Sequence, residues 1–334
     1  MRYYLAPMEG ITGYVYRNAY HAHFRPMDKY FTPFIAPKHN SGFTSRERND
    51  ILPENNQRIN LVPQILTNRS DDFLRSAEEL KDYGYREINL NLGCPSGTVV
   101  SKGKGAGFLA RREELDRFLE EISHGMEQLD MKLSVKTRLG KEKPEEFGEL
   151  LSIYNKYPIA ELIIHPRVQM DYYNNTPRME QFDIGIKESC SDVCYNGDLF
   201  DKEALRRLTE RYPQLKTVML GRGVLADPFL TEKTEAEQIK EEKQENADGA
   251  EKSGFREDKE IRRRLAAFHR DILEGYCRAM SGDRNVLFKM KELWVYMIRM
   301  FEDGEAYMKK IRKAQRLSEY EAAAGSIIRE LKLK

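Results

Sequence analysis

Cysteine, lysine and histidine side chains stand near the ends of short apolar segments of this sequence, where they could move protons. Cys94 follows Asn91-Leu92-Gly93 and precedes Pro95. A thiol with the ordinary pKa of about 8.5 stays mostly protonated at pH 7, so Cys94 is a candidate proton donor. A thiol whose pKa is lowered would instead be a nucleophile, and spacing alone leaves both roles open. Lys136 and His165 end two other apolar segments, although each taken alone is more often a structural residue.

Two glycine-containing motifs are typical of a phosphate site. They are Asn196-Gly197-Asp198 and Gly221-Arg222-Gly223. Glycine lets backbone N–H groups approach an anion, and arginine offers two parallel N–H donors. The glycine-rich stretch 102–107 has neither the P-loop nor the dinucleotide spacing, so we interpret it as a loop that lets the backbone approach a ligand near Cys94.

Other chemistries find little support in the motifs. Cys190 and Cys194 are separated by three residues, and no second Cys or His pair completes a zinc set. We therefore predict two buried structural thiols and no metal site. The G-x-S-x-G turn of a serine hydrolase is absent from the sequence.

Short apolar segments that alternate with amphipathic helices must position these residues. Eight strands are expected at 3–8, 29–35, 60–66, 86–93, 132–139, 161–166, 192–197 and 217–221, with helices at 71–83, 112–129, 145–157 and 201–211. Eight such units predict an α/β fold, a (β/α)8 TIM barrel. Polar residues follow nearly every strand, and the strand ends of a barrel converge on one mouth.

The composition is that of an ordinary globular protein. The 334 residues include 55 Lys and Arg, 54 Asp and Glu, four Cys and 40% hydrophobic residues, which excludes a disordered chain and a secreted disulfide scaffold. We find no secretory signal and no apolar stretch long enough to span a membrane. We expect a cytoplasmic protein without a membrane partner.

The C-terminal third of the chain consists of an acidic segment followed by a basic one. Residues 231–260 are acidic and poor in large apolar residues, whereas residues 261–334 hold 17 Lys and Arg against 10 Asp and Glu. We predict a barrel domain at 1–230, a charged linker at 231–260 and a smaller all-helical domain at 261–334, with helices within 261–280, 284–301 and 305–331. A basic helical domain is either a nucleic-acid footprint or a solvated face.

Seven motifs, one at each of seven strand ends, give the chain a resemblance to the tRNA-dihydrouridine synthase family. They occur in the family's order and are Leu5–Thr12, Gln64, Asn91–Pro95, Val135–Gly140, His165–Arg167, Asn196–Asp198 and Leu220–Leu225. Three positions differ from the family's common residue: Asn89 replaces Asp, Pro166 replaces Gly and Val168 replaces Thr.

The resemblance implies an FMN-dependent reduction of a uridine in tRNA, or in another structured RNA, to 5,6-dihydrouridine. NADPH would reduce the FMN, hydride would pass from the flavin N5 to uracil C6, and Cys94 would protonate C5. Residues 261–334 would form the RNA-binding domain, and we expect a monomer.

The resemblance also implies roles for individual residues. Cys94 would be the catalytic acid, and Lys136 would stabilise the negative charge of a reduced flavin. The residues that would hold the cofactor are Pro7, Met8, Glu9, Gln64, Lys136, His165, Asn196, Gly197, Asp198, Gly221 and Arg222. The residues that would contact the RNA are Asn91, Arg138, Arg167, Lys102 and Lys104.

Two alternatives remain open from the sequence. A small-molecule FMN-dependent reductase could use the same barrel without a basic helical domain. An RNA-binding protein that had lost catalysis would have no need of Cys94, Lys136 and His165.

Overall fold

Nine short parallel strands form one sheet in the computed structural model, which describes residues 1–38, 42–243 and 254–334. They are β1 (Arg2–Leu5), β2 (Lys29–Phe31), β3 (Leu61–Val62), β4 (Gln64–Ile65), β5 (Glu87–Leu92), β6 (Lys132–Gly140), β7 (Ile159–Val168), β8 (Asp192–Tyr195) and β9 (Thr217–Leu220). Their order in the sheet is β3-β2-β1-β9-β8-β7-β6-β5-β4.

Pro63 explains why the sheet has nine strands although the barrel has only eight strand positions. It separates β3 from β4, and these two short strands are the two ends of the strand order. Proline has no N–H for a strand ladder, but its carbonyl accepts a 2.9 Å hydrogen bond from the Asn89 N–H. The two ends of the sheet therefore meet in one stretch of chain, and the sheet closes into a barrel. The predicted fold class and all eight predicted strands are confirmed.

The barrel interior is layered because alternate residues of each strand point inward. Near the amino ends of the strands, Lys29 lies 2.8 Å from Glu87 and 3.4 Å from Glu161, which accepts a 2.9 Å hydrogen bond from the Tyr4 hydroxyl. A buried cluster that joins Tyr4 to apolar side chains fills the middle, with Ala6, Phe31, Val62, Ile163, Cys194 and Met219. The polar residues toward the carboxyl ends are thus built on a packed interior.

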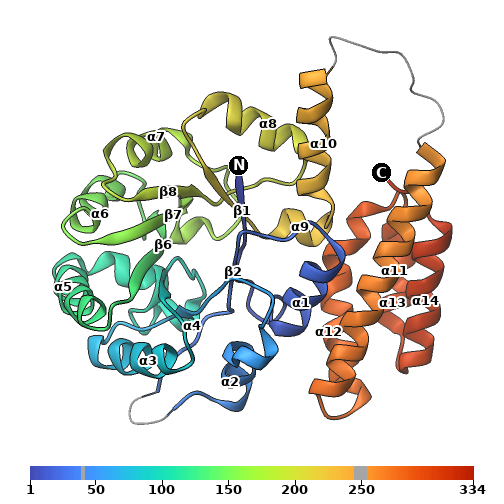
Figure 1. Cartoon of the computed structure of the whole chain (residues 1–334), viewed down its shortest axis with the longest axis horizontal. Coiled ribbons are helices and arrows are strands. Elements are labelled where there is room, and N and C mark those ends of the chain that lie inside the picture. The colour runs from blue at the N-terminus through green and yellow to red at the C-terminus, as the bar shows by residue number, and fades with distance from the viewer. Residues whose placement is uncertain (39–41, 244–253) are drawn as a thin grey trace. The chain divides into compact units, whose positions relative to one another are not determined.

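Amphipathic helices lie outside the ring of strands. They include α3 (Ser70–Asp82), α5 (Arg112–Gln128), α6 (Glu146–Tyr154) and α7 (Met179–Glu188) (Figure 1). In α3 the apolar residues Phe73, Ala77 and Leu80 are buried at helical spacing. Shorter elements are α2 (Ser45–Ile51), α4 (Gly97–Val100) and the 3-10 turns η1 (Pro53–Asn55), η2 (Gly105–Ala110) and η3 (Gln169–Asp171).

Two compact units make up the chain. The barrel unit comprises residues 1–9, 27–198 and 211–220, and the helical unit comprises residues 10–26, 199–210 and 221–334. Most of the remaining elements belong to the helical unit: α1 (Tyr14–His23), α8 (Lys202–Arg211), α9 (Arg222–Ala226), α10 (Leu230–Lys243), α11 (Gly254–Ala279), α12 (Asp283–Met297), η4 (Ile298–Met300), α13 (Gly304–Lys313) and α14 (Leu317–Glu330). The domain limits at residues 230 and 261 stay a prediction.

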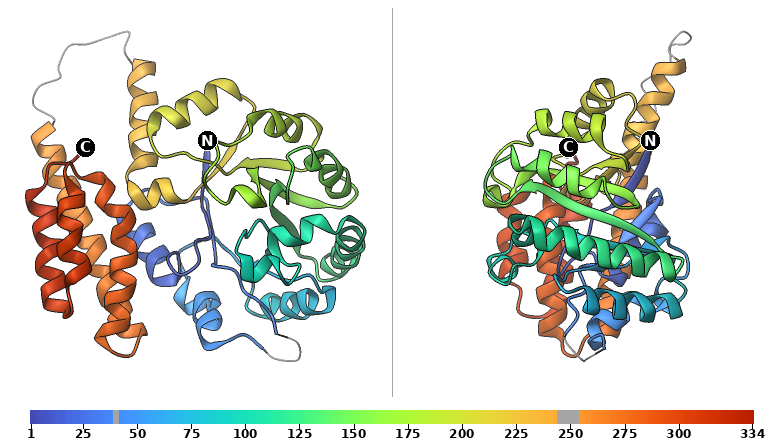
Figure 2. Two further views of the ribbon diagram at one scale, coloured as in Figure 1. Left: turned by 180° about the vertical axis from the view of Figure 1, so that it is seen from behind. Right: turned by 90° about the vertical axis from the view of Figure 1, so that its left-hand side faces the viewer.

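The helical unit contains a bundle of four helices, α11 to α14, which run alongside one another in Figure 2. Its interior holds a polar network among aromatic rings. The Trp294 indole donates a 2.7 Å hydrogen bond to the Tyr320 hydroxyl, which lies 2.6 Å from His269 Nε2. Tryptophan only donates, so Tyr320 accepts from Trp294 and can donate its own O–H to a neutral His269. Burial lowers the pKa of His269 from 6.5 to about 4.

The predictions for the helices need two refinements, and one prediction for a cysteine was wrong. The predicted range 305–331 contains two helices, α13 and α14. Of the predicted linker 231–260, residues 231–243 lie in α10 and α11 begins at Gly254, whereas 244–253 lie outside the described residues.

Cys194 is buried as predicted, but Cys190 is exposed, because it lies in the turn between α7 and β8. No helix in the described ranges is both long enough and apolar enough to span a membrane.

Candidate active site

A chain of hydrogen-bonded side chains links the three neighbouring strands β6, β5 and β4. Asn89 donates a 3.0 Å hydrogen bond to the Ser134 hydroxyl and accepts one of 2.7 Å from the Gln64 amide. The Gln64 oxygen in turn accepts a 2.7 Å hydrogen bond from Asn91. Each bond fixes which end of the next amide is the donor. The chain therefore leaves the Asn91 oxygen pointing toward the loop that follows β5.

Cys94 is held from two sides in that loop. The Asn91 side-chain oxygen accepts hydrogen bonds from the N–H groups of Gly93 (3.0 Å) and Cys94 (2.9 Å). On the other side, the Cys94 carbonyl accepts a 3.1 Å bond from Ala106 in the glycine-rich loop. Gly105 has a φ of +55°, and a Cβ there would lie 2.9 Å from the Cys94 carbonyl oxygen. Glycine is therefore required where the loop packs on the cysteine.

The Cys94 thiol is half-buried, and its environment keeps it protonated. Burial raises the pKa of the Cys94 thiol, although a backbone hydrogen bond at Ser96 and the charge of Arg138 oppose the effect. A protonated thiol suits a proton donor and does not suit a nucleophile. The structure thus favours one of the two roles that spacing left open.

Lys136 lies on β6 directly opposite Asn91 of β5 in the sheet register. Its side chain is half-buried, and no hydrogen bond or ion pair joins its ammonium group to any of the described residues. Burial, reinforced by the positive charge of Arg138, lowers the pKa of Lys136 to about 8. An interior ammonium with no anionic partner fits an anionic ligand at the mouth.

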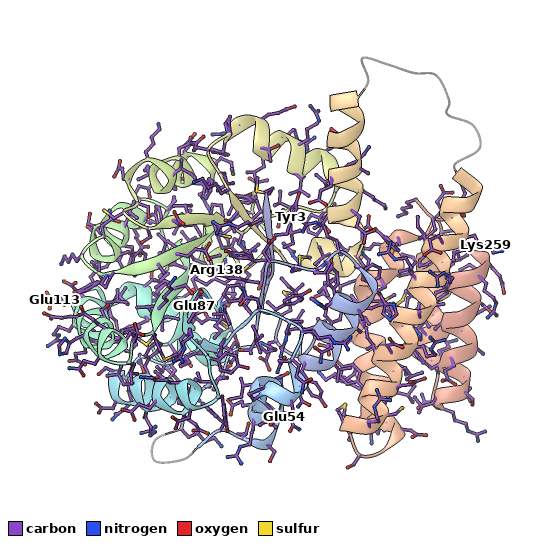
Figure 3. All side chains as sticks on the ribbon, viewed as in Figure 1. Tyr3, Glu54, Glu87, Glu113, Arg138 and Lys259 are labelled. Carbon is purple, nitrogen blue, oxygen red and sulfur yellow. The ribbon has the colours of Figure 1, made fainter. Side chains whose placement is uncertain are left out.

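Arg138 ties together the loops that follow β5 and β7. Its Nε donates to the Gly93 carbonyl (2.9 Å), Nη1 to the Val168 carbonyl (2.9 Å) and Nη2 to the Tyr172 carbonyl (2.8 Å). The Tyr173 ring lies over the guanidinium, at 5.4 Å. The residue is only 1% exposed and comes from the barrel strands, as Figure 3 shows.

Arg167 is equally buried and is paired with Asp198 through both of its terminal nitrogens. Its Nη1 also lies 3.0 Å from His165 Nε2. Arginine only donates, so this histidine nitrogen accepts and the His165 imidazole is neutral, with its proton on Nδ1. Arg138 and Arg167 therefore organise the mouth from within, and their contact with RNA stays a prediction.

The residues predicted to hold a phosphate fall in different surroundings. The Asn196 amide donates a 2.8 Å hydrogen bond to the Met219 carbonyl. A Cβ at Gly197 would overlap the Tyr195 ring, whose oxygen would lie 2.1 Å away. Gly221 precedes α9 in the helical unit, where the Arg222 guanidinium lies 5.2 Å from the Phe200 ring. Their role at a phosphate stays a prediction.

The remaining predicted residues lie at the edge of the mouth or inside the barrel. Pro7 and Met8 are half-buried after β1, and the exposed Glu9 accepts a 2.6 Å hydrogen bond from Arg46. Gln64 is fully buried. Lys102 is exposed, whereas Lys104 is half-buried and burial lowers its pKa.

Tyr173 and Gln169 belong to the site but were missing from the sequence prediction. The Tyr173 ring lies 6.0 Å from that of His165, as well as over Arg138. The Gln169 amide donates a 3.1 Å hydrogen bond to the Pro95 carbonyl, next to Cys94. An aromatic pair so soon after a polar strand end was the available signal for Tyr173, but nothing in the sequence marks Gln169.

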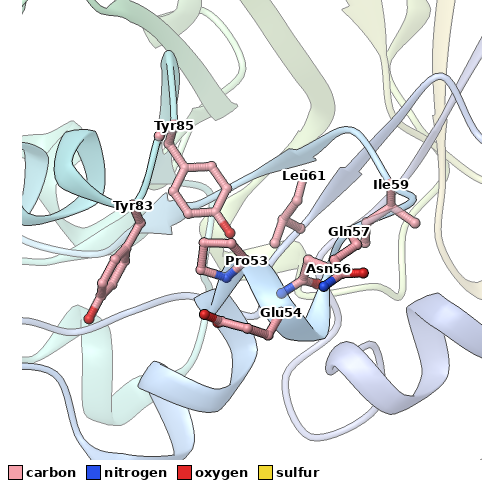
Figure 4. Close-up of a pocket in the computed structure, with 9 residues that line it drawn as sticks. Pro53, Glu54, Asn56, Gln57, Ile59, Leu61, Tyr83 and Tyr85 are labelled. Carbon is pink, nitrogen blue, oxygen red and sulfur yellow. The ribbon is translucent and has the colours of Figure 1, made fainter.

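Two pockets elsewhere contain none of the predicted site residues. One of about 370 Å³ lies beside Tyr83, Tyr85 and Pro53, near the amino ends of β3 and β5 (Figure 4). The other, of about 510 Å³, lies in the helical unit beside Phe200 and Arg299. Within the described ranges, no three His, Cys, Asp or Glu side chains are grouped so that they could hold a metal ion.

Comparison with known families decides the family of the chain. Residues 4–322 match the family described as "Dihydrouridine synthase (Dus)". The chain belongs to the dihydrouridine synthase family. Members of this family are flavin-dependent oxidoreductases, so the predicted family and enzyme class are confirmed.

Curated relatives give the same answer. A protein named "Probable tRNA-dihydrouridine synthase" from Staphylococcus aureus (strain COL) is 30% identical over 247 residues, which cover 71% of this chain and 73% of the relative. "Probable tRNA-dihydrouridine synthase 2" from Bacillus subtilis (strain 168) is 30% identical with the same coverage.

Solved structures of other enzymes share the barrel. Histamine dehydrogenase from Rhizobium sp. 4-9 aligns with a TM-score of 0.56 and 14% identity, over 72% of this chain and 46% of that longer chain. An old yellow enzyme homologue from Zymomonas mobilis aligns with a TM-score of 0.50 and 9% identity, over 71% of this chain and 88% of that one. At these identities the likeness shows the fold alone.

Proposed function

We propose that this dihydrouridine synthase family member reduces the C5–C6 double bond of a uridine in transfer RNA, with FMN as its flavin and NADPH as the reductant. The observation that carries the proposal is the pairing of a protonated thiol with an unpartnered ammonium group. Cys94 follows β5, Lys136 lies on the neighbouring strand β6, and each group influences the pKa of the other. The curated relatives' names supply the class of RNA.

The residues present fit a flavin. When bound and reduced by NADPH, FMN would supply hydride to C6 of the uracil. The Lys136 ammonium would lie where reduction leaves negative charge on the ring system, and a fixed charge in a partly buried site stabilises such an anion strongly. Pro7 and Met8 would line the flavin ring, and the buried Gln64 would orient Asn91 as well as face the ring. His165, Asn196, Gly197 and Asp198 would complete the cofactor site in the barrel unit, with Glu9 at its edge, and the roles of Gly221 and Arg222 at the cofactor stay predictions.

Cys94 would give its proton to C5 as negative charge develops there. The S–H bond breaks, a C–H bond forms, and solvent returns a proton to the thiolate afterwards. A raised pKa keeps the donor loaded at neutral pH. Asn91 would hold the uracil edge while its side-chain oxygen keeps the cysteine loop in place.

A uridine in folded RNA must leave its stack to reach the mouth of a barrel. Phosphate contacts that position the RNA would come from Lys102 and Lys104 and from basic residues of the helical unit. On α13 and just after it, Lys309, Lys310, Arg312, Lys313 and Arg316 are all exposed. A monomeric state and a cytoplasmic location stay predictions.

An anaerobic spectroscopic titration tests the function. The purified protein would show an oxidised flavin spectrum that bleaches with NADPH, and unmodified tRNA would then restore the spectrum as dihydrouridine forms. Dihydrouridine formation would be measured on the same samples by mass spectrometry. Flavin that bleaches but ignores RNA would favour a small-molecule reductase, and a protein that cannot bind flavin would contradict both enzyme proposals.

A further inference from the structure

The turn that follows β7 exposes an unusual number of large side chains. Met170 is 62% exposed, Tyr172 is 44% exposed and Tyr173 is 45% exposed. Across the described residues, only Met1, Phe288 and Val295 are also large apolar or aromatic side chains with such exposure. Half of these exposed side chains thus lie in four consecutive positions, and this concentration marks a binding surface.

The backbone of this turn is rigidly held. Asp171 is buried, where it accepts a 2.9 Å hydrogen bond from the Val168 N–H and pairs with Arg178. Met170 donates its N–H to the Lys141 carbonyl at 3.2 Å, and Arg138 holds the Tyr172 carbonyl. A turn whose backbone is already held in place loses little backbone freedom when a ligand binds it.

Tyr172 adopts a conformation that bulky residues avoid. Its φ is +49° and its ψ is −96°, and a tyrosine at positive φ is strained unless the surroundings impose it. The ring is largely exposed, and its hydroxyl has no hydrogen-bond partner in residues 1–38, 42–243 or 254–334. Strain of this kind tends to gather at ligand sites.

The turn is continuous with the candidate active site. Gln169 donates to the carbonyl of Pro95, the residue after Cys94, and Tyr173 packs beside His165. Tyr173 therefore faces the site, whereas Met170 and Tyr172 extend past it into solvent. The adjacent Lys141 is half-buried, and its ammonium lies 3.6 Å from Glu142 at the surface.

We propose that Met170 and Tyr172 form a stacking site for the nucleotide next to the target uridine, with Lys141 contacting its phosphate. The proposal rests on the proposed function and adds a second nucleotide subsite to it. When a base is flipped out, its neighbours lose a stacking partner, and aromatic side chains replace that partner for any base. A flexible thioether beside a tyrosine ring gives an apolar surface that tolerates different bases.

The test uses the full-length protein and RNA hairpins whose loop carries the target uridine beside 2-aminopurine, on either its 5′ or its 3′ side. We expect wild type to quench the 2-aminopurine fluorescence of one of the two probes. Tyr172→Phe keeps the ring and should quench as wild type does, with an affinity within about twofold. Tyr172→Leu keeps bulk without a ring, so it should abolish the quenching and weaken binding about tenfold, within the range for a stacked base.

Met170→Ala supplies a second, independent variant, with an expected loss of affinity of about threefold for the quenched probe. NADPH-dependent flavin bleaching should be unchanged in all three variants. Equal quenching by wild type and Tyr172→Leu, or no quenching of either probe by wild type, would overturn the proposal. Fluorescence is read without turnover, so a protein that stacks the probe but forms no dihydrouridine would contradict the proposed function and leave the stacking site supported.

Discussion

The side-chain oxygen of Asn91 accepts a 2.9 Å hydrogen bond from the backbone N–H of Cys94. This bond ends the amide chain that begins at Ser134, so the cysteine loop is fixed by residues of three strands. A side chain of the strand that precedes the loop thus sets the position of the candidate acid.

We predict that Asn91→Ala lowers the rate of dihydrouridine formation about a hundredfold, because a displaced acid loses its alignment with the reacting carbon. Flavin content and its bleaching by NADPH should change by less than twofold. Asn91→Asp still accepts both N–H groups, but it lacks the donor for Gln64 and places a negative charge near the thiol. Its rate of dihydrouridine formation in a single-turnover assay should lie between those of wild type and Asn91→Ala. Equal rates for all three proteins would contradict the positioning role.

We predict that Cys94→Ala abolishes dihydrouridine formation while the flavin remains bound and reducible, since only the proton donor is lost. The pH profile of wild type gives a second check. The pKa of Cys94 is raised, so the thiol stays protonated, and the single-turnover rate should hold, until the pH exceeds the ordinary thiol value. A rate that already falls between pH 6 and 7 with loss of the thiol proton would contradict the raised pKa.

We predict that the affinity of the flavin-free protein for reduced FMN, measured anaerobically, weakens above pH 8. Lys136 without an anionic partner has a pKa of about 8, so it loses its charge at higher pH, and the anionic ring of reduced FMN then binds less tightly. Between pH 7 and 9 the dissociation constant of reduced FMN should rise about tenfold in wild type. Lys136→Met should bind more weakly at pH 7 and show a flat profile over that range, and parallel profiles for the two proteins would contradict the assignment.

We predict that acid destabilises the helical bundle through His269. Its pKa of about 4 in the folded protein lies below the unfolded value of 6.5, so the unfolded chain takes up a proton first. The contribution to stability is therefore complete above pH 6.5 and is lost as the pH falls from 6.5 to 4, by about 3 kcal/mol.

Urea unfolding followed by the fluorescence of Trp294, the single tryptophan of the chain, measures this loss directly. The glutamine in His269→Gln can still accept a hydrogen bond from Tyr320, but it does not titrate. Between pH 6.5 and 4 the variant should therefore lose less free energy of unfolding than wild type, by the amount assigned to His269. An identical pH dependence in the two proteins would show that other groups cause the acid sensitivity.

Much of the barrel could be predicted from the sequence because strands, helices and polar strand ends are local patterns. The residues at the ends of β5, β6 and β7 were recognised for that reason. The bond from Gln64 to Asn91 could not be predicted, since it depends on the register between strands that are far apart in sequence. The burial of Arg138 was missed for the same reason: its three carbonyl partners come from two other loops.

The division of the predicted range 305–331 into α13 and α14 also escaped the sequence pattern. The break falls at 314–316, where Ala, Gln and Arg are all good helix formers. The structure ends α13 after Lys313 and uses the Glu319 carboxylate to accept a 2.8 Å hydrogen bond from the Gln315 N–H. Lys291 of α12 also donates hydrogen bonds of 3.0 and 2.5 Å to the Arg312 and Ala314 carbonyls, so a contact from another helix satisfies the end of α13 where local propensity alone would continue it.

The guanidinium of Arg138 holds the Gly93 and Tyr172 carbonyls at the same time. The loop that carries Cys94 and the turn that carries Tyr172 are therefore held together by one buried guanidinium group. Neither loop can shift alone without leaving part of that cation unsolvated and unbonded, which is costly in a protein interior. Any motion that opens the mouth for RNA must carry both loops together.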